Sequence, residues 1–115
     1  MGRWGEEQGA QWLRRHGFAL LEAGWQCRFG EIDLIAQKGG YICFVEVKLR
    51  RDDRFAQARE FVDHHKQQRL RTSAQMYLAQ NPTQLQPRFD VLEVYAPEGM
   101  ETRKPKIVLL ENAFE

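Results

Sequence analysis

The pair Gly39-Gly40 is the feature that most constrains the fold of this chain. Residues 31–37 before it and 41–49 after it are rich in apolar, β-branched and aromatic side chains, which favour strands. Glycine adopts a positive φ without steric cost, so two adjacent glycines suit the two-residue loop of a hairpin. The sequence therefore predicts an antiparallel β-hairpin in which Lys38 pairs with Tyr41.

The register of this hairpin determines which side chains share a face. Counting outward from the turn places Asp33 opposite Glu46 and Glu31 opposite Lys48, all on one face. A slip of one residue would exchange these charges with the apolar set on the other face, so burial of that set maintains the register. The apolar set consists of Ile32, Leu34, Val45 and Val47.

The charged face also carries Ile35 and Phe44, so we expect the hairpin to be covered on both sides. Two facing carboxylates raise each other's pKa unless a cation lies between them, and hard divalent ions prefer oxygen ligands. Asp33 and Glu46 are therefore candidate ligands of Mg²⁺ or Mn²⁺. Lys48, about 7 Å along the strand from Glu46, could orient a water or stabilise charge on a phosphate oxygen.

The same residues have a simpler interpretation. Glu-x-Lys is a common pattern on exposed strands, and Asp33 could form a plain cross-strand ion pair with Lys48. The formal net charge of +1 gives no argument for a polyanionic partner. The basic residues that follow the hairpin could bind phosphates or form a solvated loop. They are Arg50, Arg51 and Arg54.

A helix is expected over residues 3–16, where apolar and small side chains recur at helical spacing. Glu6 shares a face with Gly9, Ala10 and Leu13, whereas Glu7 aligns with Ala10, Gln11 and Arg14, so Glu6 should point further inward.

A longer helix is expected over residues 55–80, with an apolar stripe that ends at Asn81-Pro82. Lys66 lies in that stripe, four residues from Val62 and from Leu70. It could approach the carboxylates, or extend along the helix to solvent.

Three further segments have the composition of strands. Residues 18–21 predict a short first strand that leads into a turn at Ala23-Gly24, and residues 88–95 and 106–110 predict two later strands. The order helix, three strands, helix, two strands indicates an α/β fold, a mixed sheet of about five strands with helices packed on it. A length of 115 residues suits one domain, 1–115.

Other features exclude several classes of protein. Cys27 and Cys43 have no C-x-x-C spacing and are expected to be buried thiols, and the adjacent His64 and His65 point in different directions on a helix. The apolar stretches are far shorter than the ~20 residues that span a bilayer, and the N-terminus has no signal-like apolar region. We expect a cytoplasmic protein without a membrane partner.

Several motifs, in order along the chain, resemble the YraN-type family of uncharacterised bacterial proteins. The resemblance extends almost from end to end, which makes it more specific than any one motif. It is carried by Gly5-Glu6, Gly30-Glu31-Ile32-Asp33-Leu34-Ile35, Phe44-Val45-Glu46-Val47-Lys48, Arg88-Phe89-Asp90-Val91 and Asn112-Ala113-Phe114.

That family is similar to the PD-(D/E)xK nucleases, including Holliday junction resolvases and restriction enzymes. The resemblance implies a restriction-endonuclease-like core, with Asp33 and Glu46 as ligands of Mg²⁺ or Mn²⁺ and Lys48 as the catalytic lysine. Glu6 resembles the glutamate of the first helix in such sites. Glu31 ranks second, as an ion-pair partner that orients Lys48.

The leading functional hypothesis is a metal-dependent nuclease acting on nucleic acid, with DNA favoured over RNA and branched DNA suggested by analogy. Lys66 would approach its site from the long helix, and a homodimer could supply missing binding surface. Two alternatives stay open. One is a non-catalytic nucleic-acid-binding module that uses the basic loop, and the other is a protein-interaction domain anchored by Trp4, Trp12 and Trp25.

Overall fold

The computed structural model describes residues 2–51 and 63–114. The order of elements within these ranges confirms the predicted helix, three strands, helix and two strands, with a short 3-10 helix added before the last strand. The elements are α1 (Gly2–Arg15), β1 (Ala19–Cys27), β2 (Gly30–Lys38), β3 (Tyr41–Arg50), α2 (His64–Gln80), β4 (Gln86–Tyr95), η2 (Gly99–Glu101) and β5 (Lys106–Phe114).

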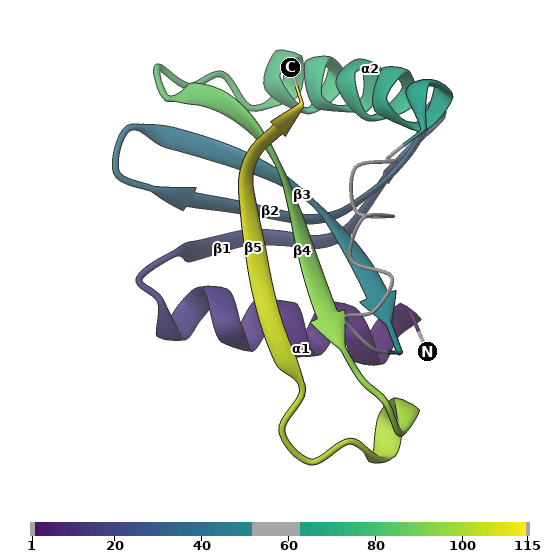
Figure 1. The fold of residues 1–115 in the computed structure, drawn as a ribbon. Helices are drawn as coiled ribbons and strands as arrows, with labels where there is room; N and C mark the ends of the chain where they lie inside the picture. The colour runs from purple at the N-terminus through teal and green to yellow at the C-terminus, as the bar shows by residue number, and fades with distance from the viewer. Residues whose placement is uncertain (1, 52–62, 115) are drawn as a thin grey trace.

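The strands form one mixed sheet in the order β1-β2-β3-β4-β5. β3 and β4 are parallel, and the other neighbouring pairs are antiparallel. α1 lies on one face of the twisted sheet and α2 on the other (Figure 1). This is the predicted α/β arrangement, and it is consistent with a restriction-endonuclease-like core.

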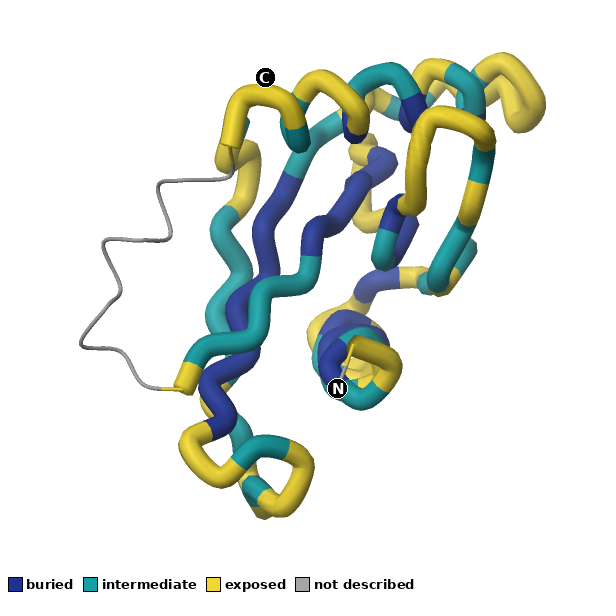
Figure 2. Tube along the Cα trace, turned by 90° about the vertical axis from the view of Figure 1, so that its right-hand side faces the viewer, coloured by how far each residue is buried: buried dark blue, intermediate teal, exposed yellow. Residues whose placement is uncertain are grey.

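Each face of the sheet has its own apolar core, so the hairpin is covered on both sides as expected. The core beneath α1 is built from Ala10, Leu13, Leu34, Val45 and Leu92, among others. The core beneath α2 includes Ile35, Ile42, Phe44, Leu70, Ala74 and Tyr77. Figure 2 shows the buried residues concentrated along the central strands.

The predicted hairpin register is correct from Lys38–Tyr41 as far as Leu34–Val45, where the ladder between β2 and β3 ends. Beyond Leu34, β2 continues to pair with β1. The prediction that Ile32 shares a face with Leu34 is wrong, because Ile32 packs in the core beneath α2. Where β2 is no longer paired with β3, its side chains do not keep the faces of the sheet that the hairpin register predicts.

Two strand boundaries also differ from the prediction. β1 continues through the expected turn at Ala23-Gly24 to Cys27, because Gly24 adopts a φ of 66° and lets the strand bend without ending. β5 extends past the expected end at Leu110 to Phe114, with a register shift between Phe89 and Val91 on the neighbouring strand. Bulges of this kind leave little trace in composition.

α2 begins at His64 and not at residue 55, because Asp63 has an extended backbone with φ −63° and ψ 154°. Its carboxylate accepts hydrogen bonds from the amides of His65 (2.8 Å) and Lys66 (3.3 Å), which caps the helix. Residues 55–62 of the expected helix lie outside the described residues. The C-terminal half of the predicted stripe is confirmed by burial of Leu70, Ala74 and Tyr77.

The cysteines and histidines behave nearly as expected. Both thiols are free, with Cys43 buried and Cys27 only half-buried, and His64 and His65 are exposed. No helix in residues 2–51 and 63–114 has the length and apolarity needed to cross a membrane.

Asp90 supports the sheet where β4 meets β5. It is fully buried on β4 and accepts hydrogen bonds from Arg88 Nε (3.0 Å) and Nη2 (2.9 Å). Its Oδ1 also accepts from the amide of Asn112, at 2.8 Å, where β5 passes the register shift. The Asp90 carboxylate therefore links the side chain of Arg88 on β4 to the backbone of β5 at the register shift.

The substitution Asp90→Ala should lower the free energy of unfolding by about 3 kcal/mol, because it removes the buried partner of a largely buried guanidinium, whose other ion pair is with the exposed Glu111. The side chain of Arg88 is 12% exposed. Urea denaturation followed by circular dichroism measures the change. Glu101→Ala removes an exposed carboxylate and should alter stability little, so equal losses in the two variants would contradict this role for Asp90.

Candidate active site

Three carboxylates meet where β2 separates from β3. Glu6 comes from α1, and Glu31 and Asp33 come from β2, with one ligand oxygen from each lying within 4.8 Å of the others. Glu6 is half-buried and Glu7 is exposed, as their positions on the helix predict. The cluster thus joins two elements that are separated in sequence by the whole of β1.

Small residues on α1 bring Glu6 to this position. A Cβ atom on Gly5 would lie 3.2 Å from the side chain of Leu49, and one on Gly9 would lie 3.2 Å from Leu34 and Leu92. These separations are tighter than ordinary van der Waals contact. The absence of side chains therefore allows the first turns of the helix to lie close against the sheet.

Asp33 is fixed by a backbone hydrogen bond and not by the predicted pairing with Glu46. Its Oδ2 accepts a hydrogen bond from the Val47 amide at 2.8 Å, just beyond the end of the β2–β3 ladder. Burial, followed by the negative charge of Glu46, raises the pKa of Asp33 to about 7. Burial and the charge of Glu31 also raise the pKa of Glu6.

Glu46 and Lys66 form an ion pair across the opening between β3 and α2. Glu46 is buried, whereas Lys66 is partly exposed. Burial acts to lower the pKa of Lys66, but the hydrogen bond to Glu46 and its charge prevail and raise it. Burial and then the positive charge of Lys66 lower the pKa of Lys48. Lys66 therefore lies beside Glu46 and Asp33, and Lys48 lies beside Lys66 and Glu46.

The prediction for Glu31 requires a correction. It was expected opposite Lys48 as an ion-pair partner, but its partner in the β1–β2 ladder is Gln26 and its carboxylate lies with Glu6 and Asp33. The reason is again that the residues of β2 that precede Leu34 in sequence do not pair with β3. The i, i+2 spacing had already predicted that Glu31 and Asp33 share one face, and their carboxylates lie together.

Two cavities open onto these residues. One, of about 280 Å³, is lined by the carboxylates of β2 and β3 and by residues of α2. The other, of about 240 Å³, lies toward the start of α1. Both are lined by Asp33, Glu46 and Lys66. Arg69, whose sequence position suggested a phosphate contact, and Ser73, which sequence analysis missed, follow Lys66 at i+3 and i+7, a spacing that places them on one helix face.

The basic residues after the hairpin lie in different settings. The Nε of Arg50 lies 3.5 Å from Glu93 Oε2, and its side chain is 21% exposed, so this guanidinium has a partner within the sheet. Arg51 is exposed, and Arg54 lies outside the described residues.

The donor set at the cluster fits a hard divalent cation. Carboxylate oxygens are the ligands that Mg²⁺ and Mn²⁺ prefer, and three of them lie together with Glu46 nearby. The raised pKa values of Asp33 and Glu6 reflect burial and the mutual repulsion of these groups. A bound cation would offset that repulsion and favour the charged carboxylates.

The pKa of Asp33 predicts how stability depends on pH in the metal-free protein. Because its folded-state pKa of about 7 exceeds the ordinary value of about 3.9, the folded state binds the proton more tightly, and stability should fall as pH rises through this interval. Asp33→Asn should therefore stabilise the protein by roughly 2 kcal/mol more at pH 8 than at pH 4.

Urea denaturation in a chelating buffer at both pH values measures this difference. Glu7→Gln provides the matched control, since Glu7 is exposed and outside the cluster. A gain for Asp33→Asn that is the same at pH 4 and pH 8 would contradict the electrostatic explanation.

Comparison with known proteins places the chain among bacterial relatives. The model of "Uncharacterised protein family UPF0102" matches residues 5–94. A UPF0102 protein of Caldanaerobacter subterraneus is 46% identical over 99% of this chain and 93% of the relative. UPF0102 proteins of Syntrophomonas wolfei and Pseudomonas aeruginosa are 40% and 39% identical, covering 99% of this chain and 96% and 91% of theirs. The chain therefore belongs to UPF0102, the YraN-type family that its motifs resemble.

Proposed function

We propose that this protein is a metal-dependent nuclease that hydrolyses phosphodiester bonds in nucleic acid, with DNA as the expected substrate. The observation that carries the proposal is the carboxylate cluster of Glu6, Glu31 and Asp33 within 4.8 Å, beside Glu46 and two lysines. Cavities open onto it, so a substrate can reach the side chains. Acids and lysines at one opening suit the transfer of a negatively charged phosphoryl group.

The residues that would hold Mg²⁺ or Mn²⁺ are Glu6, Glu31, Asp33 and Glu46. Such an ion, when bound, supplies Lewis-acid polarisation of a phosphate oxygen and lowers the pKa of a water molecule.

The chain's own residues prepare the site in three ways. The Val47 amide fixes the orientation of Asp33 through a 2.8 Å hydrogen bond. Lys66 holds the buried carboxylate of Glu46 and balances its charge. Lys48 follows Glu46 at i+2 on β3 and lies beside Lys66, and we expect its ammonium to donate hydrogen bonds to a phosphate oxygen and to counter the charge that develops during hydrolysis. Its lowered pKa also makes the neutral amine easier to reach, which suits an exchange of a proton with water.

A cleavage assay tests the proposal directly. Purified protein is incubated with linear, single-stranded, supercoiled and four-way-junction DNA, and with RNA, in the presence of Mg²⁺, Mn²⁺ or a chelator. We expect cleavage only with a divalent ion. Asp33→Asn, Glu46→Gln and Lys48→Met should each reduce the rate on the order of 100-fold or more, because each removes a group that acts on the reacting phosphate or its metal.

Glu101→Gln is the control for these variants, since it removes an exposed carboxylate outside the cluster and the cavities around it and should retain full activity. Cleavage that survives both Asp33→Asn and Glu46→Gln would refute the mechanism. Binding of nucleic acid without any cleavage would instead support the non-catalytic binding module.

Glu31 provides a separate test of the metal site. If its carboxylate is a ligand, Glu31→Gln should weaken Mn²⁺ binding roughly tenfold or more, as measured by isothermal titration calorimetry. If Glu31 served only to orient Lys48, metal affinity would change little while cleavage would still fall. Glu22→Gln, a β1 substitution outside the cluster, controls for loss of negative charge.

A further inference from the structure

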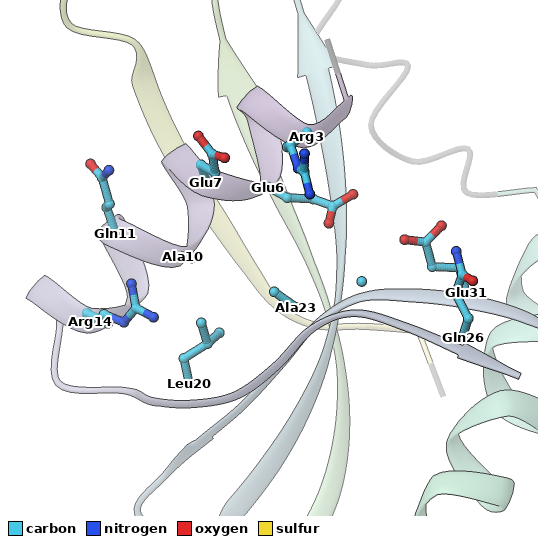
Figure 3. Close-up of a pocket in the computed structure, with 11 residues that line it drawn as sticks. Arg3, Glu6, Glu7, Ala10, Gln11, Arg14, Leu20, Ala23, Gln26 and Glu31 are labelled. Atoms are coloured by element: carbon cyan, nitrogen blue, oxygen red, sulfur yellow. The ribbon is translucent and has the colours of Figure 1, made fainter.

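A third cavity, of about 560 Å³, runs from the carboxylate cluster along α1 (Figure 3). One wall is the helix, and the other is formed by Leu20, Ala23 and Gly24 of β1. Glu6 and Glu31 line this cavity and also belong to the carboxylate cluster, and their side chains point toward one another. The cavity is therefore continuous with the proposed active site, and we call it the α1 groove.

Two arginines on α1 line the groove. Arg3 and Arg14 are eleven residues apart, which is close to three full turns at 3.6 residues per turn, so they lie on the same side of the helix. Both are exposed. At a rise of 1.5 Å per residue they are separated by about 16 Å along the axis. A stacked nucleic-acid strand rises ~3.4 Å per nucleotide, so that span corresponds to about five nucleotides.

The charges of the groove favour a polyanion once the acidic cluster has its cation. Glu6 and Glu31 belong to that cluster, which leaves Glu7 as the remaining acidic residue in the lining, against two arginines. Guanidinium groups bind phosphates through paired hydrogen bonds. Ala23 on the facing wall contributes only a small side chain to the lining.

Cationic residues also lie on the other side of the cluster. Lys66 and Arg69 of α2 line the 280 Å³ cavity, which shares Glu31 with the α1 groove. The carboxylates are thus flanked by positive side chains from both helices. A strand that crossed the cluster would meet phosphate-binding groups before and after the reacting bond.

We propose that the α1 groove binds the backbone of one nucleic-acid strand on one side of the bond to be cut, through Arg3 and Arg14, while the cavity beside Arg69 receives the other side. This inference deepens the proposed function and rests on it, because the two sides are defined by cleavage at the carboxylates. Nothing in this arrangement selects a base, so binding should depend little on sequence.

The test compares two double variants of equal charge, each in a Lys48→Met background that suppresses cleavage but keeps the carboxylates, with Mn²⁺ present throughout. Arg3→Ala/Arg14→Ala removes the groove's arginines. Arg15→Ala/Arg103→Ala removes two exposed arginines outside the groove. Affinity for a fluorescein-labelled single-stranded DNA is measured by fluorescence anisotropy over a range of salt concentrations, and thermal unfolding verifies that all variants fold.

The groove variant should bind at least roughly tenfold more weakly, and its slope of log affinity against log salt should fall by about 1.4, or ~0.7 for each lost phosphate contact. The control should keep the affinity and slope of the parent. Equal effects in the two double variants, or no binding by the parent, would overturn the inference. Should either variant unfold, the single charge reversals Arg14→Glu and Arg15→Glu repeat the comparison.

Cleavage is measured separately in the wild-type background, so the two proposals fail in different ways. If the protein cleaves nucleic acid but the Arg3/Arg14 variant binds as tightly as the control variant, the groove proposal is wrong and the nuclease proposal is retained. If the Arg3/Arg14 variant binds more weakly than the control but the wild type shows no metal-dependent cleavage, the nuclease proposal is wrong and the groove is supported as a strand-binding surface.

Discussion

The hydrogen bond from the Val47 amide to Asp33 Oδ2 replaces the next rung of the hairpin ladder, which ends at Leu34–Val45. From that point β2 follows β1, and the sheet opens between β2 and β3. A buried backbone donor that lost its strand partner would be costly if left unsatisfied. The side chain of Asp33 meets this need, and in doing so its carboxylate is held at the opening, where elements from both faces of the sheet can reach it.

The two helices reach that opening from opposite faces. On one face, the glycines Gly5 and Gly9 let α1 lie close to the sheet. One carboxylate oxygen of Glu6 thereby lies within 4.8 Å of the carboxylate oxygens of β2, close enough for all of them to bind one metal ion. On the other face, Asp63 caps α2 so that its first turn presents Lys66 to Glu46. A basic side chain therefore reaches the carboxylates from α2, and an acidic one joins them from α1.

Sequence patterns predicted the parts of this structure that depend on local chemistry. Gly39-Gly40 fixed the turn and hence the register near it, and the position of Glu6 on its helix predicted its inward direction. The departure of β2 from β3 could not be predicted, because it results from a side chain taking the place of a backbone acceptor. Glu31 consequently joined the carboxylates and not Lys48. The start of α2 was missed for a related reason, since an apolar stripe does not reveal an aspartate cap.

Net charge is a poor guide to what such a site can bind. The chain carries a formal charge of only +1, yet the acids gather at the opening while Arg3, Arg14 and Arg69 line cavities on either side. Over a Debye length of ~8 Å at physiological salt, a phosphate responds to the nearest side chains and not to the sum over the molecule. A divalent ion among the carboxylates would offset most of the negative charge at the centre of this path. In the proposed function, the same ion would therefore lessen the repulsion that a strand meets between the two cationic flanks.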